Sequence, residues 1–394
     1  MSETTIFGPP GTGKTTKLIE IVKDRISSGV DPKRIGFFSF SKKAATEARD
    51  RASVELGLDT KDMVYFRTLH SLAFQWLGLN SQNVFKGSDY NELGRLVGLD
   101  FRTSQTLNIE EGPLFNIGAG GDKYMAVIQM ARVKQIEVQM QYVSGWDYDI
   151  NWQQLNVLDK AYKDYKRVKG KYDFVDMIEK FIVEGTSPEF DLLIIDEAQD
   201  LAPLQWSMVK KVLVPNSKEV YYAGDDDQAI YSWMGVDVDQ FLLASRDKMI
   251  LKKSYRVPEV IHGMADTLIK KLRVREEKKW KPHKQKGSIT WHRDILDVDL
   301  SSGEWLILAR TNYIVNKVCV KLKEDGHLFW REGTGWSISL NVLNAIEIWI
   351  KLCKKEELTS EQLKSFSKLV DPKIITKSGR KIMSTLDSDE TYTL

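Results

Sequence analysis

Residues 4–16, TTIFGPPGTGKTT, decide the fold predicted for this chain. Residues 4–8 form a short strand-like run, and residues 14–27 carry apolar side chains at helical spacing. Between them, glycines let backbone N–H groups point inward at phosphate oxygens, and the N-terminus of a helix favours the same negative charge; they are Gly8, Gly11 and Gly13. The stretch predicts a strand, a phosphate-binding loop and a helix.

This loop also predicts the residues that hold a nucleotide. Lys14 would neutralise the β- and γ-phosphates, and the Thr15 hydroxyl would bind Mg²⁺. The full set expected around the phosphates is Gly8, Pro9, Pro10, Gly11, Thr12, Gly13, Lys14, Thr15 and Thr16. A glycine-rich turn without a ligand is the structural alternative. The loop does not choose among NTPases, because GPPGTGKT is equally at home in hexameric AAA-type ATPases.

Outward from the loop, apolar runs alternate with amphipathic segments. Strands are predicted at 35–40, 63–67, 192–195, 219–223 and 248–251, and helices at 44–56 and 205–213. This alternation predicts an α/β fold with a doubly wound parallel sheet. Residues 79–170 break the rhythm with helical patterns at 123–134 and 155–169 and no strand between them.

Beyond residue 252 the pattern is mixed. A helix is predicted over 258–272, and the mixed-charge stretch 270–286 is interpreted as a linker or a solvated surface. Strands at 288–292 and 305–308 and a helix over 312–324 suggest a second α/β domain, and helix returns over 337–370. The predicted organisation is a first domain (1–78 plus 171–252), a helical insertion (79–170), the start of a second sheet domain (253–340) and an incomplete second helical insertion (341–394).

Composition excludes several classes of protein. The 394 residues include 57 Lys plus Arg and 55 Asp plus Glu, a net charge of +2, so a nucleic-acid surface has to be local. No apolar run reaches the roughly 18–20 residues that span a bilayer, and no signal peptide is recognisable. Two distant cysteines, Cys319 and Cys353, are expected as buried thiols in a reducing cytoplasm.

Paired carboxylates stand at the end of an apolar strand in the stretch LLIIDEAQD (192–200). At the carboxyl edge of a parallel sheet these side chains would face the phosphate loop. Asp196 is predicted to hold Mg²⁺ through water, and Glu197 to act as the general base for the attacking water. The alternative is capping of the following helix, a role that Asp200 could fill in part.

The segment AGDDDQAIYSWMG (223–235) follows another apolar strand and is the most specific element. Gln228 could reach the γ-phosphate or the attacking water. Tyr231 and Trp233 lie two residues apart on a loop, where aromatic rings suit stacking on unpaired bases. One segment could thus couple hydrolysis to strand movement. The alternative for Trp233 is a hydrophobic anchor between two domains.

DEAQD and GDDDQAIYSW together resemble the superfamily 1 DNA helicases of the UvrD/Rep type. FSKKAATEA (40–48) and RTLHSLA (67–73) are similar to that family's single-strand-binding motifs, and YDFVD (172–176) to the segment that re-enters its first motor domain. LKKSYR (251–256) resembles a motif in which Tyr stacks on adenine and Arg reaches the γ-phosphate. LARTN (308–312) resembles the first DNA contact of the second motor domain.

The resemblance implies a P-loop NTPase with RecA-like domains that uses ATP and Mg²⁺ and moves 3′→5′ on single-stranded or partially duplex DNA. Partners in replication or repair are expected. The catalytic set would be Lys14, Glu197, Gln228 and Arg256, with Tyr255 and Arg256 added to the nucleotide contacts. The DNA contacts would be Ser41, Lys42, Thr68, His70, Tyr231, Trp233, Arg310 and Asn312. Without the resemblance, Lys42 is equally a solvated helix start, His70 a structural histidine and Arg256 a surface residue.

Several departures from the family pattern define an alternative. No upstream helix supplies the Gln that reads adenine, so preference for ATP over other NTPs is open. Met234 replaces an Arg and Ser254 an Asn, and one polar contact could be missing at each. Two later motifs of the family are not found in residues 340–394. The expectation is a truncated or minimised helicase, with an ATP-responsive DNA-binding module as the alternative.

Overall fold

The computed structural model describes residues 1–101, 120–144, 150–370 and 391–392. The chain divides into two compact units, Met1–Ile289 and Thr290–Leu394, and the domain boundaries predicted from sequence stay predictions. None of the helices in the described part of the chain combines the length and apolarity needed to cross a membrane.

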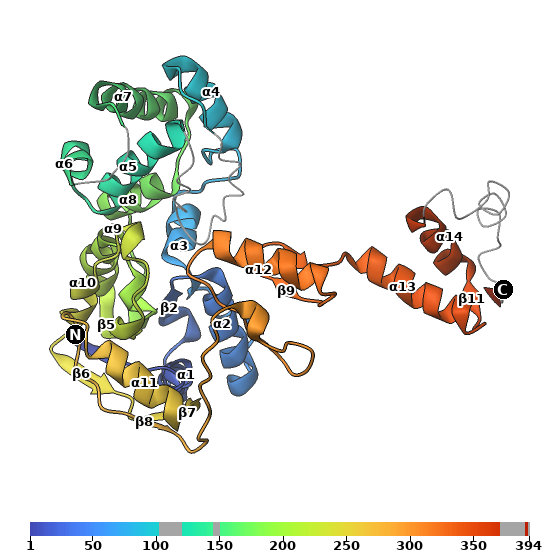
Figure 1. Cartoon of the computed structure of the whole chain (residues 1–394). Helices are drawn as coiled ribbons and strands as arrows, with labels where there is room; N and C mark the ends of the chain where they lie inside the picture. The colour runs from blue at the N-terminus through green and yellow to red at the C-terminus, as the bar shows by residue number, and fades with distance from the viewer. Residues whose placement is uncertain (102–119, 145–149, 371–390, 393–394) are drawn as a thin grey trace. The chain divides into compact units, whose positions relative to one another are not determined.

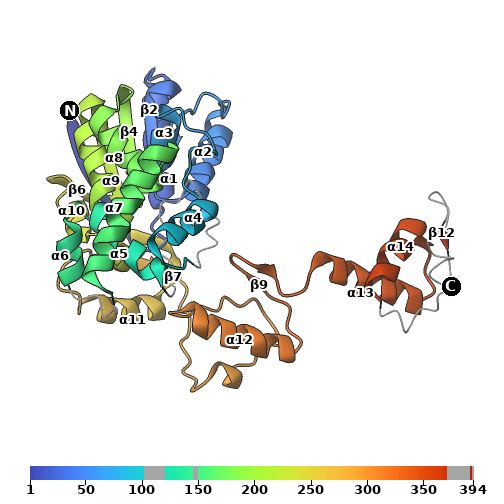
Figure 2. The ribbon, with the colours of Figure 1, turned by 90° about the horizontal axis from the view of Figure 1, so that it is seen from above.

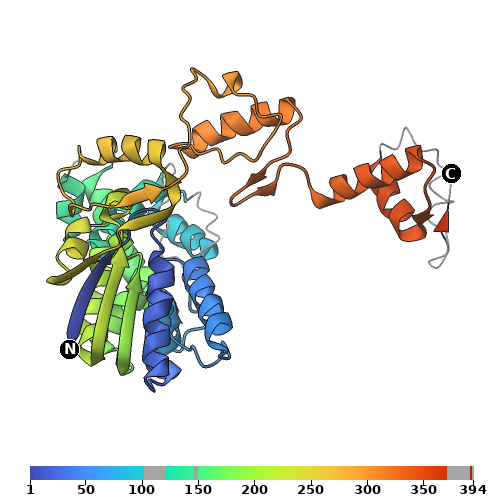
Figure 3. The same ribbon diagram turned by 90° about the horizontal axis from the view of Figure 1, so that it is seen from below.

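The first unit is built on a parallel six-stranded sheet of order β3-β2-β4-β5-β1-β6 (Figure 3). Every described pairing in it is parallel, so the predicted doubly wound α/β fold is confirmed. The strands are β1 (Ser2–Phe7), β2 (Ile35–Ser39), β3 (Phe66–Arg67), β4 (Phe190–Asp196), β5 (Ser217–Gly224) and β6 (Asp247–Ile250).

Helices cover both faces of this sheet. Ile6, Phe37 and Ile194 point into one core with α1 (Lys14–Ser27) and α2 (Lys42–Leu56). Their chain neighbours point into the opposite core, because side chains alternate along a strand. The helices on that second face are α3 (Leu69–Trp76), α8 (Phe174–Glu184), α9 (Pro203–Met208) and α10 (Val238–Leu242).

The segment predicted as a helical insertion is helical where it is described. Its helices α4 (Gly87–Val97), α5 (Gly121–Val133), α6 (Val138–Val143) and α7 (Trp152–Lys169) gather at one end of the first unit (Figure 1). They share a core of their own that includes Leu93, Ile128, Leu158 and Tyr162. A single backbone bridge between Val84 and Tyr172 closes the base of the insertion.

Residues 253–289 form a small βαβ element of the first unit. β7 (Lys253–Pro258) pairs in parallel with β8 (Lys281–His283), and α11 (Glu259–Ile269) lies beside them (Figure 2). The interpretation of 270–286 as a linker or solvated surface was wrong in part, because Lys278 is 6% exposed. Its charge is buried against three carboxylates, a tertiary pairing that the local charge pattern does not reveal.

The second unit contains α12 (Asn312–Glu324), α13 (Leu340–Cys353), α14 (Ser360–Leu369) and the two-residue strand pairs β9 (Trp330–Arg331) with β10 (Gly335–Trp336) and β11 (Leu358–Thr359) with β12 (Thr391–Tyr392). The strands predicted at 288–292 and 305–308 are not formed; Leu306 and Leu308 are exposed, without a neighbouring strand to pair. The prediction of two buried thiols was also wrong: Cys353 is exposed and Cys319 half-buried.

Candidate nucleotide-binding site

The loop between β1 and α1 has the backbone of a phosphate-binding loop. Gly11 and Gly13 adopt φ of 70° and 80°, a left-handed conformation that glycine takes without strain. The N–H of Gly8 donates to the Gly224 carbonyl at 2.9 Å, which ties the loop to the end of β5. No side chain caps the N-terminus of α1, so its first N–H groups are available to phosphate oxygens.

Lys14 lies against the two carboxylates at the end of β4. Its Nζ donates to Glu197 Oε2 at 2.5 Å and lies 3.8 Å from Asp196 Oδ1. Burial alone would lower the pKa of Lys14, but Asp196 and Glu197 outweigh burial and raise it. Burial raises the pKa of Asp196 to about 6, helped by Glu197 and opposed by Lys14. The predicted phosphate cation, metal ligand and base therefore converge on one place.

The oxygen donors predicted to bind Mg²⁺ fit that ion. Thr15 is the second residue of α1 and Asp196 the last of β4, and hydroxyl and carboxylate oxygens are ligands that Mg²⁺ prefers. Within the described residues, no group of three or more His, Cys, Asp or Glu side chains forms a complete metal cage. Mg²⁺ does not need one, because it keeps waters and substrate phosphates among its ligands.

Glu197 occupies a strained backbone position. Its φ of 53° is left-handed, a conformation that costs a residue with a Cβ about 1–2 kcal/mol. Such strain clusters at functional sites, where the surrounding structure holds it. The turn lets Asp196 and Glu197 both face Lys14, which supports a functional role for the pair over simple helix capping.

Gln199 was missed by the sequence analysis, although it lies inside DEAQD. Its Nε2 donates to Glu197 Oε2 at 2.9 Å and to Asp200 Oδ2 at 3.2 Å, and its Oε1 accepts from the Asp225 N–H at 3.1 Å. It thus links the two acidic segments that follow β4 and β5. The sequence signal for this role was an amide side chain placed between carboxylates in DEAQD. Because an amide both donates and accepts hydrogen bonds, it can bridge two acidic segments.

Asp200 lies beside this pair. Its side chain is buried, and Oδ1 has no hydrogen-bond partner among the described residues. Burial and the nearby Glu197 carboxylate raise the pKa of Asp200 to about 7. We name Lys14, Asp196, Glu197, Gln199 and Asp200 the edge cluster.

Gln228 is exposed on the short turn after β5. Its Nε2 donates to Asp225 Oδ2 at 2.6 Å. Because Asp225 also donates its N–H to Gln199, Gln228 is joined to Glu197 through two residues. The structure therefore connects the two predicted catalytic segments by hydrogen bonds.

β7 brings the predicted Tyr255 and Arg256 to the phosphate loop. The Tyr255 N–H donates to the Gly11 carbonyl at 2.8 Å, and a Cβ placed on Gly11 would lie 2.5 Å from the Arg256 Cβ. Ser254 Oγ donates to the Pro10 carbonyl at 2.8 Å and accepts from two backbone N–H groups. Ser254 thus makes a polar contact with the loop itself, and the loss of the contact made by the family's Asn stays a prediction.

Some of the predicted DNA contacts are buried in the structure, and others are exposed. Ser41 and Thr68 cap α2 and α3 by accepting from the Ala44 and Ser71 N–H groups. Thr68 and His70 are buried, and burial lowers the pKa of His70 to about 4. Both residues are almost fully buried, and their part in DNA binding stays a prediction.

The other predicted DNA contacts are more accessible. Lys42 is exposed at the start of α2, and Tyr231 stacks on Phe40 with ring centroids 5.5 Å apart. The backbone of Trp233 lies in a short 3₁₀ turn, Ser232–Met234, and its side chain lies outside the described part. Arg310 and Asn312 are exposed residues of the second unit.

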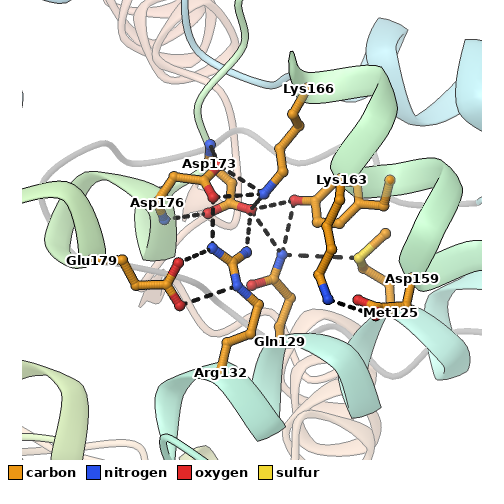
Figure 4. Close-up of polar contacts among 10 residues, drawn as sticks. Met125, Gln129, Arg132, Asp159, Lys163, Lys166, Asp173, Asp176 and Glu179 are labelled. Atoms are coloured by element: carbon orange, nitrogen blue, oxygen red, sulfur yellow. Dashed lines mark hydrogen bonds and ion pairs between the residues drawn. The ribbon is translucent and has the colours of Figure 1, made fainter. Parts of the chain in front are cut away.

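A second buried charge cluster lies where the helical insertion meets α8 (Figure 4). We name it the junction cluster: Arg132, Lys166, Asp173, Asp176 and Glu179. Arg132 donates to Asp173 at 2.7 Å and to Asp176 at 2.6 Å, and Lys166 reaches the same two carboxylates. The sequence analysis singled out YDFVD but not these basic partners, which come from α5 and α7.

Comparison with known proteins bears directly on this site. Residues 1–249 match the family described as the UvrD/REP helicase N-terminal domain. Similar proteins include a probable DNA helicase of Mycoplasma pneumoniae (22% identity, 69% of this chain and 54% of the relative). The chain is also similar to the ATP-dependent DNA helicase PcrA of Leuconostoc citreum (23% identity, 83% of this chain and 44% of the relative). It is similar as well to PcrA of Bacillus subtilis (25% identity, 75% of this chain and 41% of the relative). The chain spans about two fifths to half of the length of these relatives.

Proposed function

The chain belongs to the UvrD/REP helicase family through its N-terminal domain, and from this premise we propose that it hydrolyses ATP to move 3′→5′ along single-stranded DNA. Helicase activity on partially duplex DNA would follow from the same movement. Replication or repair proteins are the partners that this activity suggests.

One observation carries the proposal. Hydrogen bonds run from Lys14 through Glu197, Gln199 and Asp225 to Gln228. Three residues beyond Gln228, Tyr231 stacks on Phe40, next to the cap of α2. A change at the phosphates can therefore be passed through short, directional contacts to an aromatic loop suited to unpaired bases.

In this proposal each side chain has one task. Lys14 holds phosphate oxygens, Glu197 accepts a proton from the attacking water, and Gln228 orients that water. Arg256, held at Gly11 by β7, adds positive charge near the γ-phosphate. Thr15 and Asp196 would hold Mg²⁺, which when bound neutralises charge between the β- and γ-oxygens.

An ATP-responsive DNA-binding module is the second candidate. The observation that favours it is the second unit, whose strand pairs in the described residues are two residues long. A motor needs a second sheet domain that moves against the first, whereas binding and release of DNA need only a contact surface that responds to ATP.

The deciding experiment measures ATP hydrolysis by the full chain with and without oligo-dT. We expect stimulation by oligo-dT and its loss in Tyr231→Ala, because base stacking contributes about 1–3 kcal/mol per base. Displacement of streptavidin from the 5′ end of an oligonucleotide, but not from the 3′ end, would establish the direction. DNA binding that responds to ATP without stimulated turnover would favour the second candidate, and the same rates with GTP would remove the preference for ATP.

A further inference from the structure

Three consecutive aspartates after β5 share one buried lysine. Lys278 Nζ lies 3.1 Å from Asp225 Oδ1 and 2.9 Å from Asp227 Oδ2, and it also donates to Asp226. The Lys278 side chain has no exposed surface. An ammonium group has three donors, and here each of them has a carboxylate. Arg275 adds a two-pronged pair with Asp227, at 2.8 and 2.9 Å.

The contact between Lys278 and Asp225 connects Lys278 to the candidate nucleotide site. Asp225 uses its second oxygen, Oδ2, to hold the amide of Gln228, and its N–H reaches Gln199. Asp225 is also close enough to raise the pKa of Lys14. The position of Gln228 therefore depends on a carboxylate that Lys278 neutralises and orients.

Lys278 is also connected to Arg256, through the strand pair β7 and β8. Lys278 lies three residues before β8, and the Lys281 N–H donates to the Lys252 carbonyl at 2.8 Å, where β7 begins. β7 carries Tyr255 and Arg256 against Gly11 of the phosphate loop. Lys278 thus joins the strand pair that holds Arg256 to the turn that holds Gln228.

We propose that Lys278 is a positioning residue for ATP hydrolysis, which aligns Gln228 and Arg256 through one buried contact. The inference rests on the proposed ATPase function. A purely structural role is the competing explanation, because removing Lys278 would leave three buried carboxylates without this cation. The two explanations differ in whether the folded protein binds ATP normally and hydrolyses it slowly.

The test compares Lys278→Met with Lys279→Met in the full chain. Lys279 is the adjacent lysine, 91% exposed and 4.0 Å from Glu277. We expect Lys278→Met to lower kcat about 10- to 100-fold, the effect of a misplaced catalytic group, with ATP affinity within about twofold of the parent. Lys279→Met should match the parent in both.

Hydrogen–deuterium exchange provides a readout that does not need turnover. We expect faster exchange in residues 225–231 and 253–258 of Lys278→Met, with the rest of the sheet unchanged. Equal exchange there, or an unchanged kcat in a hydrolysing parent, would overturn the inference. A parent that shows no hydrolysis would count against the proposed function instead, and exchange would still decide whether Lys278 holds both segments.

Should Lys278→Met fail to fold, Lys278→Arg keeps the charge and allows the same comparison. A planar guanidinium cannot place three donors as an ammonium does, so kcat and exchange should change in the same direction by a smaller amount. A Lys278→Arg variant indistinguishable from the parent in both would overturn the dependence on three-point geometry.

Discussion

The edge cluster and the junction cluster contain the same kinds of side chain but differ in how fully their charges are paired. In the junction cluster, Asp173 accepts from Arg132, Lys166, Gln129 and Tyr162. Although burial acts to raise its pKa, these partners hold the pKa of Asp173 well below its ordinary value. The edge cluster has one cation, Lys14, for three carboxylates. Lys14 pairs with Asp196 and Glu197, and an oxygen of Asp200 has no described partner.

We expect this difference to separate a cluster that fixes structure from one that binds a ligand. A network in which every carboxylate has a cationic partner resists change, since removing a cation leaves buried charge with fewer partners. An incompletely neutralised cluster can gain from an added cation or proton. A nucleotide with its Mg²⁺ would bring both new cationic charge and phosphates that Lys14 could hold in place of Glu197.

The largest expected effect comes from removing the cation of the edge cluster. Lys14→Ala should abolish binding of Mg-ATP, because phosphate charge is left uncompensated in the loop. Isothermal titration calorimetry measures it. Lys17→Ala, one turn along α1 and paired with Glu20, is the matched control. ATP affinity in Lys14→Ala equal to that of the parent would contradict the assignment of the site.

The next effect separates chemistry from binding within the same cluster. Glu197→Gln keeps the shape but loses the base, so hydrolysis should fall by about 10²–10⁴ while ATP still binds. A phosphate-release assay alongside calorimetry measures both. Glu189→Gln, on the exposed end of an ion pair with Arg34, controls for loss of a carboxylate. Undiminished turnover in Glu197→Gln would leave Glu197 with a structural role only.

The junction cluster should respond in stability and not in chemistry. Arg132→Met leaves the buried Asp173 and Asp176 with Lys166 but without their second cationic partner, and removal of one partner from a buried pair typically costs about 3–5 kcal/mol of unfolding free energy. Urea unfolding measures the loss, and ATP affinity of the folded protein should be retained. Arg167→Met, 78% exposed, should cost less than about 1 kcal/mol. Similar losses in both variants would remove the contrast between the clusters.

The smallest effect concerns protons in the edge cluster. Folded Asp200 has a pKa raised to about 7 by burial, against 3.8 as its ordinary value. It therefore holds a proton that the unfolded chain has released, and its contribution to stability is lost as pH rises from about 4 to 7. Between pH 5 and 7, Asp200 should lower the free energy of unfolding by about 2 kcal/mol. Asp200→Asn should remove this pH-dependent loss. Urea unfolding at both pH values measures it, and an identical slope would refute the raised pKa.

The geometry of the candidate nucleotide site was predictable because its signals are local. The phosphate loop, α1 and the acidic ends of β4 and β5 each depend on residues adjacent in sequence, and the structure brings Lys14, Asp196 and Glu197 together. Gln228 and Arg256 were also assigned from short motifs, and their neighbours Asp225 and Gly11 explain how they are held.

The features that the sequence analysis did not predict depend on contacts between distant segments. Lys278 stands in a mixed-charge run that is typical of solvent exposure, and only the fold places it beside Asp225–Asp227. Arg132 and Lys166 likewise lie on helices whose apolar periodicity was the visible signal. The strand predicted at 305–308 failed for the opposite reason: an apolar run does not form a strand without a neighbour to pair with.

The left-handed backbone at Glu197 sets stability against activity at a single position. Glycine takes this conformation freely, so Glu197→Gly should relieve about 1–2 kcal/mol of backbone strain while losing the proposed base and its hydrogen bond with Lys14. Selection for heat resistance alone would favour that change, and selection for turnover would forbid it. A carboxylate at φ 53° is therefore a folding cost that the proposed role in hydrolysis would offset, and a screen for thermostable variants tests whether glycine is recovered at this position.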